Sequence, residues 1–190
     1  MAQNPNPPEW YENDPLFFQE LSSGFLWEAQ VCSFLSSHDF QVRPSGRGVR
    51  THVGATTKYR EMVSLWCEGV PIHVKGREEV FYQPASFPFD GVFIDEVQNF
   101  DAKNPRPEYV ICVSKLTGSM LVLDVAATRS HWTTRTDRDS VRGTYKTRYV
   151  CHQDLWQPMY VFLLIMRRRK EAAERAARIA SGQKVTVLGA

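Results

Sequence analysis

The sequence predicts a single α/β (α+β) domain in which a central mixed sheet is flanked by an N-terminal helix and a long C-terminal helix. Three observations support this class. The chain has 190 residues, the length of one ordinary domain, and 43% of them are apolar, enough to form a core. Helical periodicity occurs near both ends of the chain. Between these ends lie short runs rich in strand-forming residues, separated by proline and glycine.

The helices define the limits of the expected domain. Residues 1–15 contain four prolines and predict a flexible N-terminal segment, residues 16–181 form the domain, and residues 182–190 are a tail. Apolar residues three or four apart predict a helix over Leu16–Leu35, although Ser22-Ser23-Gly24 leaves open a start near Ser23. Residues 155–181 predict the long C-terminal helix, which is apolar in its first half and charged in its second.

The strands are expected in the middle of the chain, where β-forming residues cluster between turn residues. Two tight turns are expected, at Glu68-Gly69 and at Lys115–Gly118. Residues 44–58 predict a basic loop, and residues 128–149 show no clean period. The predicted strands are Phe40–Arg43, Glu61–Cys67, Val70–Lys75, Gly91–Val97, Glu108–Ser114 and Ser119–Val125.

The charge of the chain is unevenly distributed, although the net charge is only +2. Residues 1–95 contain 7 Lys/Arg against 12 Asp/Glu, whereas residues 96–190 contain 16 against 9. An acidic half that carries carboxylates and a basic half that contacts phosphates suit a nucleic-acid enzyme. Phosphate-loop, GxGxxG, GxSxG and HExxH motifs do not occur in the sequence, which gives no support to the commonest ATPase, Rossmann, hydrolase and zinc-protease classes.

The spacing of the cysteines and the length of the apolar runs indicate the cellular compartment in which we expect the protein. The four cysteines lack zinc-binding spacing and stand beside apolar residues, so we expect reduced core thiols. The N-terminal residues contain no apolar signal-peptide region, and the longest apolar run, Met159–Met166, is far shorter than the roughly 20 residues of a membrane span. These observations predict a soluble, cytoplasmic protein without a membrane partner.

The most informative stretch runs from Glu61 to Lys75. If Glu61–Cys67 and Val70–Lys75 form a hairpin, Glu61 begins one strand, while His73 and Lys75 share one face of the next. An acid, an imidazole and an ammonium group then meet at one sheet edge. Glu28 on the first helix would join them if that helix crosses the same edge.

This pattern resembles the restriction-endonuclease-like (PD-(D/E)XK) superfamily of metal-dependent nucleases, in particular its phage-encoded members. The superfamily combines an acid, a hairpin and a (D/E)-x-K motif, and many members carry a helical G-x-x-x-E, matched here by Gly24-Phe-Leu-Trp-Glu28. The resemblance implies cleavage of DNA with Mg²⁺ or Mn²⁺, in the cytoplasm of a bacterial or phage-infected cell. It implies catalytic roles for Lys75, Glu61 and Glu28, with Glu61, His73 and Glu28 as metal ligands.

One position departs from the motif, because His73 stands where the superfamily has an acid. Mg²⁺ prefers oxygen ligands, so this histidine weakens a Mg²⁺ site or favours Mn²⁺. Two interpretations stay open: a working nuclease with an altered ligand set, or a catalytically inactive nuclease-fold protein that binds DNA or serves in phage assembly. The alternatives without a catalytic role are that His73 is a structural histidine and that Lys75 is a lysine at the end of a strand. Asp95, in an acidic cluster with Asp90 and Glu96, either points toward the site or faces solvent.

The basic segment 128–149 is the candidate nucleic-acid surface. It combines six cations with three aromatic residues, and such side chains contact phosphates and stack on unpaired bases. The alternative is a solvated, charge-rich loop. The candidate DNA-binding residues are Arg129, Arg135, Arg138, Arg142, Lys146 and Arg148.

Overall fold

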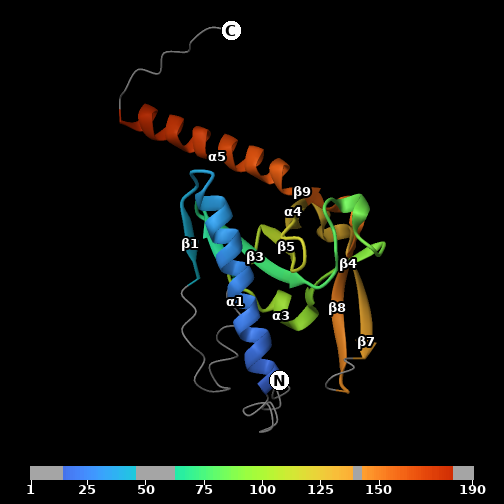
Figure 1. The fold of residues 1–190 in the computed structure, drawn as a ribbon. Coiled ribbons are helices and arrows are strands. Elements are labelled where there is room, and N and C mark those ends of the chain that lie inside the picture. Colours follow the sequence, from blue (N-terminus) through green and yellow to red (C-terminus); the bar gives the residue numbers. More distant parts are fainter. Residues whose placement is uncertain (1–14, 46–62, 139–142, 182–190) are drawn as a thin grey trace, which may run out of the picture.

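The computed structural model describes residues 15–45, 63–138 and 143–181, and it has the mixed α+β architecture expected from the sequence. A mixed sheet is accompanied by an N-terminal helix and a C-terminal helix (Figure 1). The basic loop expected over 44–58 lies almost wholly outside the described residues, as do Glu61 and Arg142. The helices and strands are α1 (Pro15–Ser36), β1 (Val42–Pro44), β2 (Leu65–Cys67), β3 (Val70–Arg77), β4 (Gly91–Glu96), α3 (Val97–Asp101), β5 (Tyr109–Ser114), β6 (Met120–Asp124), α4 (Val125–Thr128), β7 (Thr133–Arg138), β8 (Tyr145–His152), β9 (Gln157–Pro158) and α5 (Met159–Ala180).

The strands form two sheets. The larger has the order β1-β2-β3-β5-β6-β9, in which β3 and β5 are parallel and the other neighbours antiparallel. The smaller has the order β4-β8-β7 and is antiparallel throughout. The expected hairpin between β2 and β3 is confirmed, with its turn at Glu68 and Gly69, both of which have positive φ.

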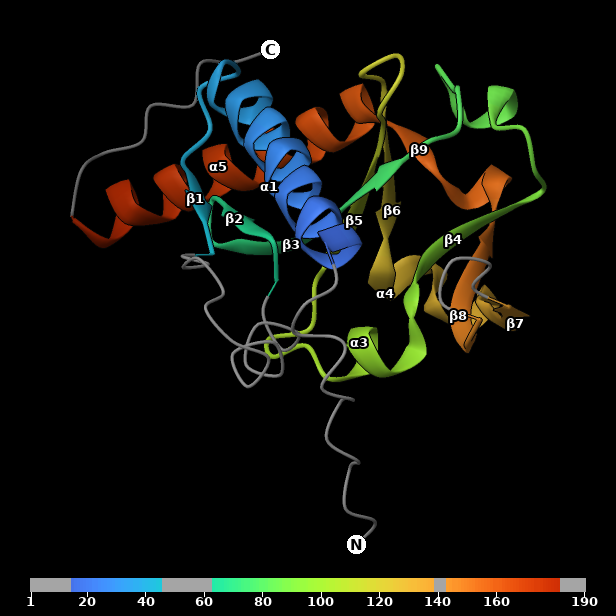
Figure 2. The same ribbon diagram turned by 60° about the horizontal axis from the view of Figure 1, so that its bottom comes forward.

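Each face of the larger sheet packs into its own apolar cluster, because side chains alternate along the strands. Ile72, Val74 and Ile111 point to the face covered by α1 and by the first half of α5. Val110 and Cys112 point to the opposite face, which is covered by α3 and the smaller sheet. In Figures 1 and 2, α1 and the β4-β8-β7 sheet accordingly lie on opposite sides of β3 and β5.

Helix α1 approaches β3 closely at one glycine. A Cβ atom built on Gly76 would lie 2.4 Å from Cδ1 of Trp27, which is too near for any side chain. The indole of Trp27 therefore rests directly on the β3 backbone and fixes the position of α1 over the sheet.

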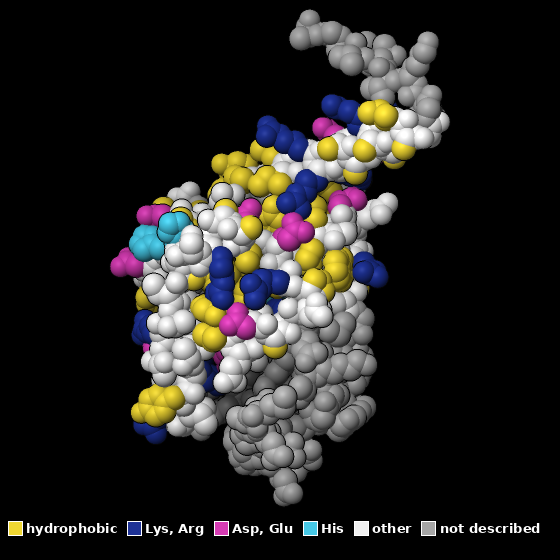
Figure 3. Space-filling model, turned by 180° about the vertical axis from the view of Figure 1, so that it is seen from behind, with side chains coloured by type: hydrophobic (Ala, Val, Ile, Leu, Met, Phe, Trp, Pro, Cys, Tyr) yellow, Lys and Arg dark blue, Asp and Glu magenta, His cyan; other side chains and the backbone are white. Residues whose placement is uncertain are grey.

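Helix α5 is only half embedded. Met159, Phe162 and Met166 are buried in the core, whereas every residue from 171 to 180 is exposed. Figure 3 shows this distal half projecting from the body with charged side chains along it. The helix begins at Met159 rather than at residue 155, because Pro158 fixes an extended backbone just before it.

The main difference from the expected elements lies in residues 128–149. The segment forms a strand hairpin, β7–β8, preceded by the short helix α4. Cys67, Cys112 and Cys151 are buried and Cys32 is half-buried, all as free thiols. None of the helices in the described ranges is long and apolar enough to cross a membrane.

Candidate functional site

Strand β3 directs two polar side chains away from α1. Ile72 and Val74 point into the cluster beneath α1, so His73 and Lys75 between them point to the other face of the sheet. His73 is almost fully buried, while the side chain of Lys75 keeps 31% of its surface exposed. The expectation that these two residues share one face is thus met.

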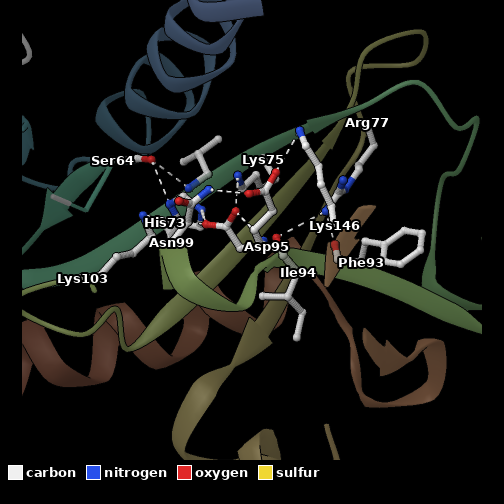
Figure 4. Close-up of polar contacts among 12 residues, drawn as sticks. Ser64, His73, Lys75, Arg77, Phe93, Ile94, Asp95, Asn99, Lys103 and Lys146 are labelled. Atoms are coloured by element: carbon white, nitrogen blue, oxygen red, sulfur yellow. Dashed lines mark hydrogen bonds and ion pairs between the residues drawn. The ribbon is translucent and has the colours of Figure 1, made fainter. Parts of the chain in front are cut away.

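The carboxylate that joins them comes from β4. Asp95 is 5% exposed, and its Oδ1 lies 2.7 Å from Lys75 Nζ. Its Oδ2 lies 3.0 Å from His73 Nε2 and 3.8 Å from the ammonium of buried Lys103 (Figure 4). The register of β4 shifts between Phe93 and Glu96, which allows Asp95 to turn inward although Ile94, its neighbour, is also fully buried.

The charges in this cluster are set by burial and by the two lysines. Burial opposes ionisation of Asp95, but Lys75, His73 and Lys103 outweigh it and hold the pKa of the carboxyl well below its usual value. Burial, followed by the charge of Lys103, holds the pKa of His73 well below 6.5, despite the opposing effect of Asp95. The site at neutral pH is therefore an aspartate and a neutral imidazole beside ammonium groups.

Contacts with Ser64 and with the adjacent backbone hold His73 and Asp95 in place. Ser64 Oγ lies 3.4 Å from His73 Nδ1 and accepts a hydrogen bond from the Val74 N–H at 3.1 Å. The Glu96 N–H donates to Asp95 Oδ1 at 2.9 Å. These contacts orient the imidazole and the carboxylate toward each other.

A second layer of contacts ties β4 to β3 and β8. Arg77 donates to the carbonyl oxygens of Phe93 and Ile94. The carboxylate of Glu96 accepts from Asn99 at 3.3 Å and lies 3.0 Å from Lys146 Nζ on β8 (Figure 4). The site is thus connected to the basic hairpin.

The donor set of His73 and Asp95 fits part of a metal site. His73 Nε2 and Asp95 Oδ2 are buried and face each other, close enough for a hydrogen bond when Nε2 carries the ring proton. Two ligands at a right angle on one ion, each with a bond of roughly 2.1 Å, stand about 3 Å apart, which matches the 3.0 Å between these atoms. The described ranges offer no group of three His, Cys, Asp or Glu that could hold a metal. His73 and Asp95 are thus two possible ligands, and the ammonium group of Lys75 lies beside them, 2.7 Å from the carboxylate.

The structure does not bring all the expected site residues together. Glu28 is buried on α1, which covers the face of the sheet opposite to His73 and Lys75, and it does not join His73 and Asp95 in a metal-binding group of the described residues. Glu61 precedes β2 and lies outside the described residues.

The expected DNA-binding residues fall into two environments. Arg135 and Arg138 are exposed on β7, and half-buried Lys146 and Arg148 lie on β8. Arg129 instead packs among aromatic rings, with its guanidinium 3.9 Å from the ring centre of Tyr149, and pairs with Asp101 at 3.1 Å. This contact set gives Arg129 a packing role next to α3.

Comparison with protein-family models, with curated proteins and with solved structures finds no match for this chain. The geometry of the site is therefore what indicates a function for this chain.

Proposed function

We propose that this protein is a nuclease-like protein that binds DNA and cleaves phosphodiester bonds with a divalent metal ion. The observation that carries the proposal is the position of Asp95, 2.7 Å from Lys75 and 3.0 Å from His73. Asp95 supplies from β4 the acid that position 73 lacks on β3. An acid–lysine pair of the kind implied by the resemblance is thereby formed from two strands.

The residues have distinct roles in this proposal. Asp95 and His73 would hold the ion, which when bound activates a water molecule and offsets phosphate charge. Lys75 is the partly exposed member of the cluster, and its ammonium group would present a positive charge to the scissile phosphate and to the attacking water. Buried Lys103 helps to keep Asp95 ionised and therefore able to accept an ion.

The test is cleavage of linear, supercoiled and branched DNA with Mg²⁺ or Mn²⁺. We expect Lys75→Met to lower the cleavage rate by about 100-fold or more, the usual scale for a group that assists proton transfer. The matched control is Lys115→Met, because Lys115 also pairs with a carboxylate, that of Glu78, and this variant should cleave at the wild-type rate. Equal rates for wild type and Lys75→Met would refute the proposed site.

A binding measurement tests the metal separately from cleavage. Mn²⁺ at 100 times its Kd should stabilise the wild type by about 2.7 kcal/mol, raising the Tm by roughly 5–10 °C. His73→Gln should abolish this shift. Mn²⁺ stabilisation that survives in His73→Gln would place the ion elsewhere.

A second candidate function is DNA binding without cleavage. It is favoured by the two ammonium groups, of Lys75 and Lys103, that already compensate the charge of Asp95. This function predicts DNA binding that persists in EDTA, falls steeply with salt and is accompanied by no metal-dependent cleavage. If the protein changes the gel mobility of neither single- nor double-stranded DNA at low salt, it would have a structural role instead.

A further inference from the structure

The outer face of the smaller sheet carries an aromatic ring between two arginines. Phe93 lies on β4 between Val92 and Ile94, both fully buried in the core. Because side chains alternate along a strand, the half-buried ring of Phe93 points outward. The ring therefore lies on the outer face of the smaller sheet.

The two arginines reach this ring from neighbouring strands. Arg148 on β8 has its guanidinium carbon 5.4 Å from the ring centre, and Arg135 on β7 lies 5.6 Å from it. Arg135 and Arg148 are paired directly across the two strands. All three strands of the sheet thus contribute one side chain to what we call the Phe93 platform, formed by Phe93, Arg135 and Arg148.

The Phe93 platform adjoins the candidate site. Phe93 precedes Asp95 by two residues, a separation of about 7 Å along an extended strand. Arg77, at the end of β3, donates to the carbonyl of Phe93 and so fixes the platform to the strand that carries His73 and Lys75. Arg77 thus holds the Phe93 platform in a fixed position relative to the strand that carries His73 and Lys75.

We infer that the Phe93 platform binds an unpaired nucleotide of single-stranded DNA. The two guanidinium groups lie over the ring, so a base can stack on their planes, or on the ring itself when one guanidinium turns to a flanking phosphate. Bases within a duplex are stacked on one another and do not present a face to such a ring. The choice of DNA rests on the proposed function, and the platform adds to it a preference for single-stranded over duplex DNA.

The experiment is fluorescence anisotropy in EDTA with a labelled 20-nucleotide oligothymidine and with a duplex of equal length. Phe93→Leu keeps an apolar side chain but removes the ring, and it should weaken oligothymidine binding by about tenfold, a typical effect for one lost base stack. Duplex binding should change by less than twofold. Phe89→Leu is the matched control, because Phe89 is a surface phenylalanine outside the Phe93 platform, and it should leave both affinities unchanged.

Arg135→Gln gives a second, independent readout that does not depend on the fold tolerating a change at Phe93. The side chain of Arg135 is 67% exposed, so the variant should melt like the wild type, with a slope of log K against log salt on oligothymidine shallower by about 0.7, the value for one phosphate contact on a single strand. Unchanged oligothymidine affinity in Phe93→Leu, an equal loss on duplex, or tighter binding of oligouridine RNA than of oligothymidine would overturn the inference. DNA cleavage by the wild type would still stand in those cases, whereas absence of both binding and cleavage would refute the proposed function itself.

Discussion

His73 and Asp95 are buried together, and the protein holds one neutral and the other charged. The two lysines favour this arrangement, since an ammonium group beside a carboxylate lowers its pKa and an ammonium group beside an imidazole also lowers its pKa. A neutral imidazole retains a nitrogen lone pair for an ion, and an ionised carboxylate retains its oxygens. These are the protonation states that the ion site of the proposed function requires.

The buried neutral state of His73 predicts a dependence of stability on pH. Unfolded, the imidazole binds a proton below pH 6.5, whereas in the folded protein its pKa lies well below that value. The unfolded state then holds the extra proton, so the free energy of unfolding should fall as pH drops from 7 to 5, by up to about 1.4 kcal/mol per pH unit below 6.5. Denaturant unfolding in EDTA measures this.

The comparison that isolates this effect is His73→Gln. The variant should lose stability less steeply between pH 7 and 5, whatever its stability at pH 7. The titration of Asp95 does not contribute in this range, because its folded pKa is lowered from 3.8 and its effect appears only at lower pH. Identical pH slopes in wild type and His73→Gln would show that His73 binds its proton equally well in the folded and the unfolded protein.

The sequence predicted part of this cluster, and the rest depended on tertiary structure. His73 and Lys75 were placed on one face, because two residues apart on a strand is a local property. The inward turn of Asp95 was one of two alternatives, since a register shift in β4 breaks the alternation that would decide it. Lys103 was missed entirely: it follows α3 in a proline-rich stretch, and no periodicity marks its burial.

The strands also differ in how well the sequence predicts them. The β2–β3 and β5–β6 hairpins were predicted, because buried strands have apolar residues and their turns carry glycine. The β7–β8 hairpin was not, because β7 is an edge strand on which almost every side chain is exposed. An edge strand with two polar faces lacks the alternating pattern that identifies a strand from sequence.

The contact between α1 and β3 predicts a strong effect of one methyl group. Gly76→Ala should destabilise the protein by about 1–3 kcal/mol, because the new Cβ would lie 2.4 Å from the Trp27 ring and force α1 away from the sheet. Chemical denaturation measures the change. Combining it with Trp27→Leu removes the clash, so the double variant should be more stable than the sum of the two single effects predicts. Additive effects would mean that Trp27 does not lie on Gly76.

At the scale of the whole molecule, the larger sheet separates two cores, and α5 contributes to one of them with only its first half. Arg169 pairs with Glu108, and Lys170 contacts the Asp39 carbonyl and lies 3.5 Å from Glu68. Beyond these contacts, residues 171–180 are exposed. The cooperative unit should therefore end near residue 170, and the distal turns should open independently of it.

Proline substitution at two exposed positions of α5 tests this division. A helix-interior proline costs about 3 kcal/mol or more, but only where the helix must stay formed for the core to stay packed. Leu164 is 52% exposed and lies in the embedded half, so Leu164→Pro should lower the Tm by roughly 6–12 °C. Ala176→Pro in the distal half should lower helical circular dichroism and leave the Tm within about 2 °C of the wild type. A large fall in the Tm of Ala176→Pro would show that the distal half of α5 is part of the cooperative fold.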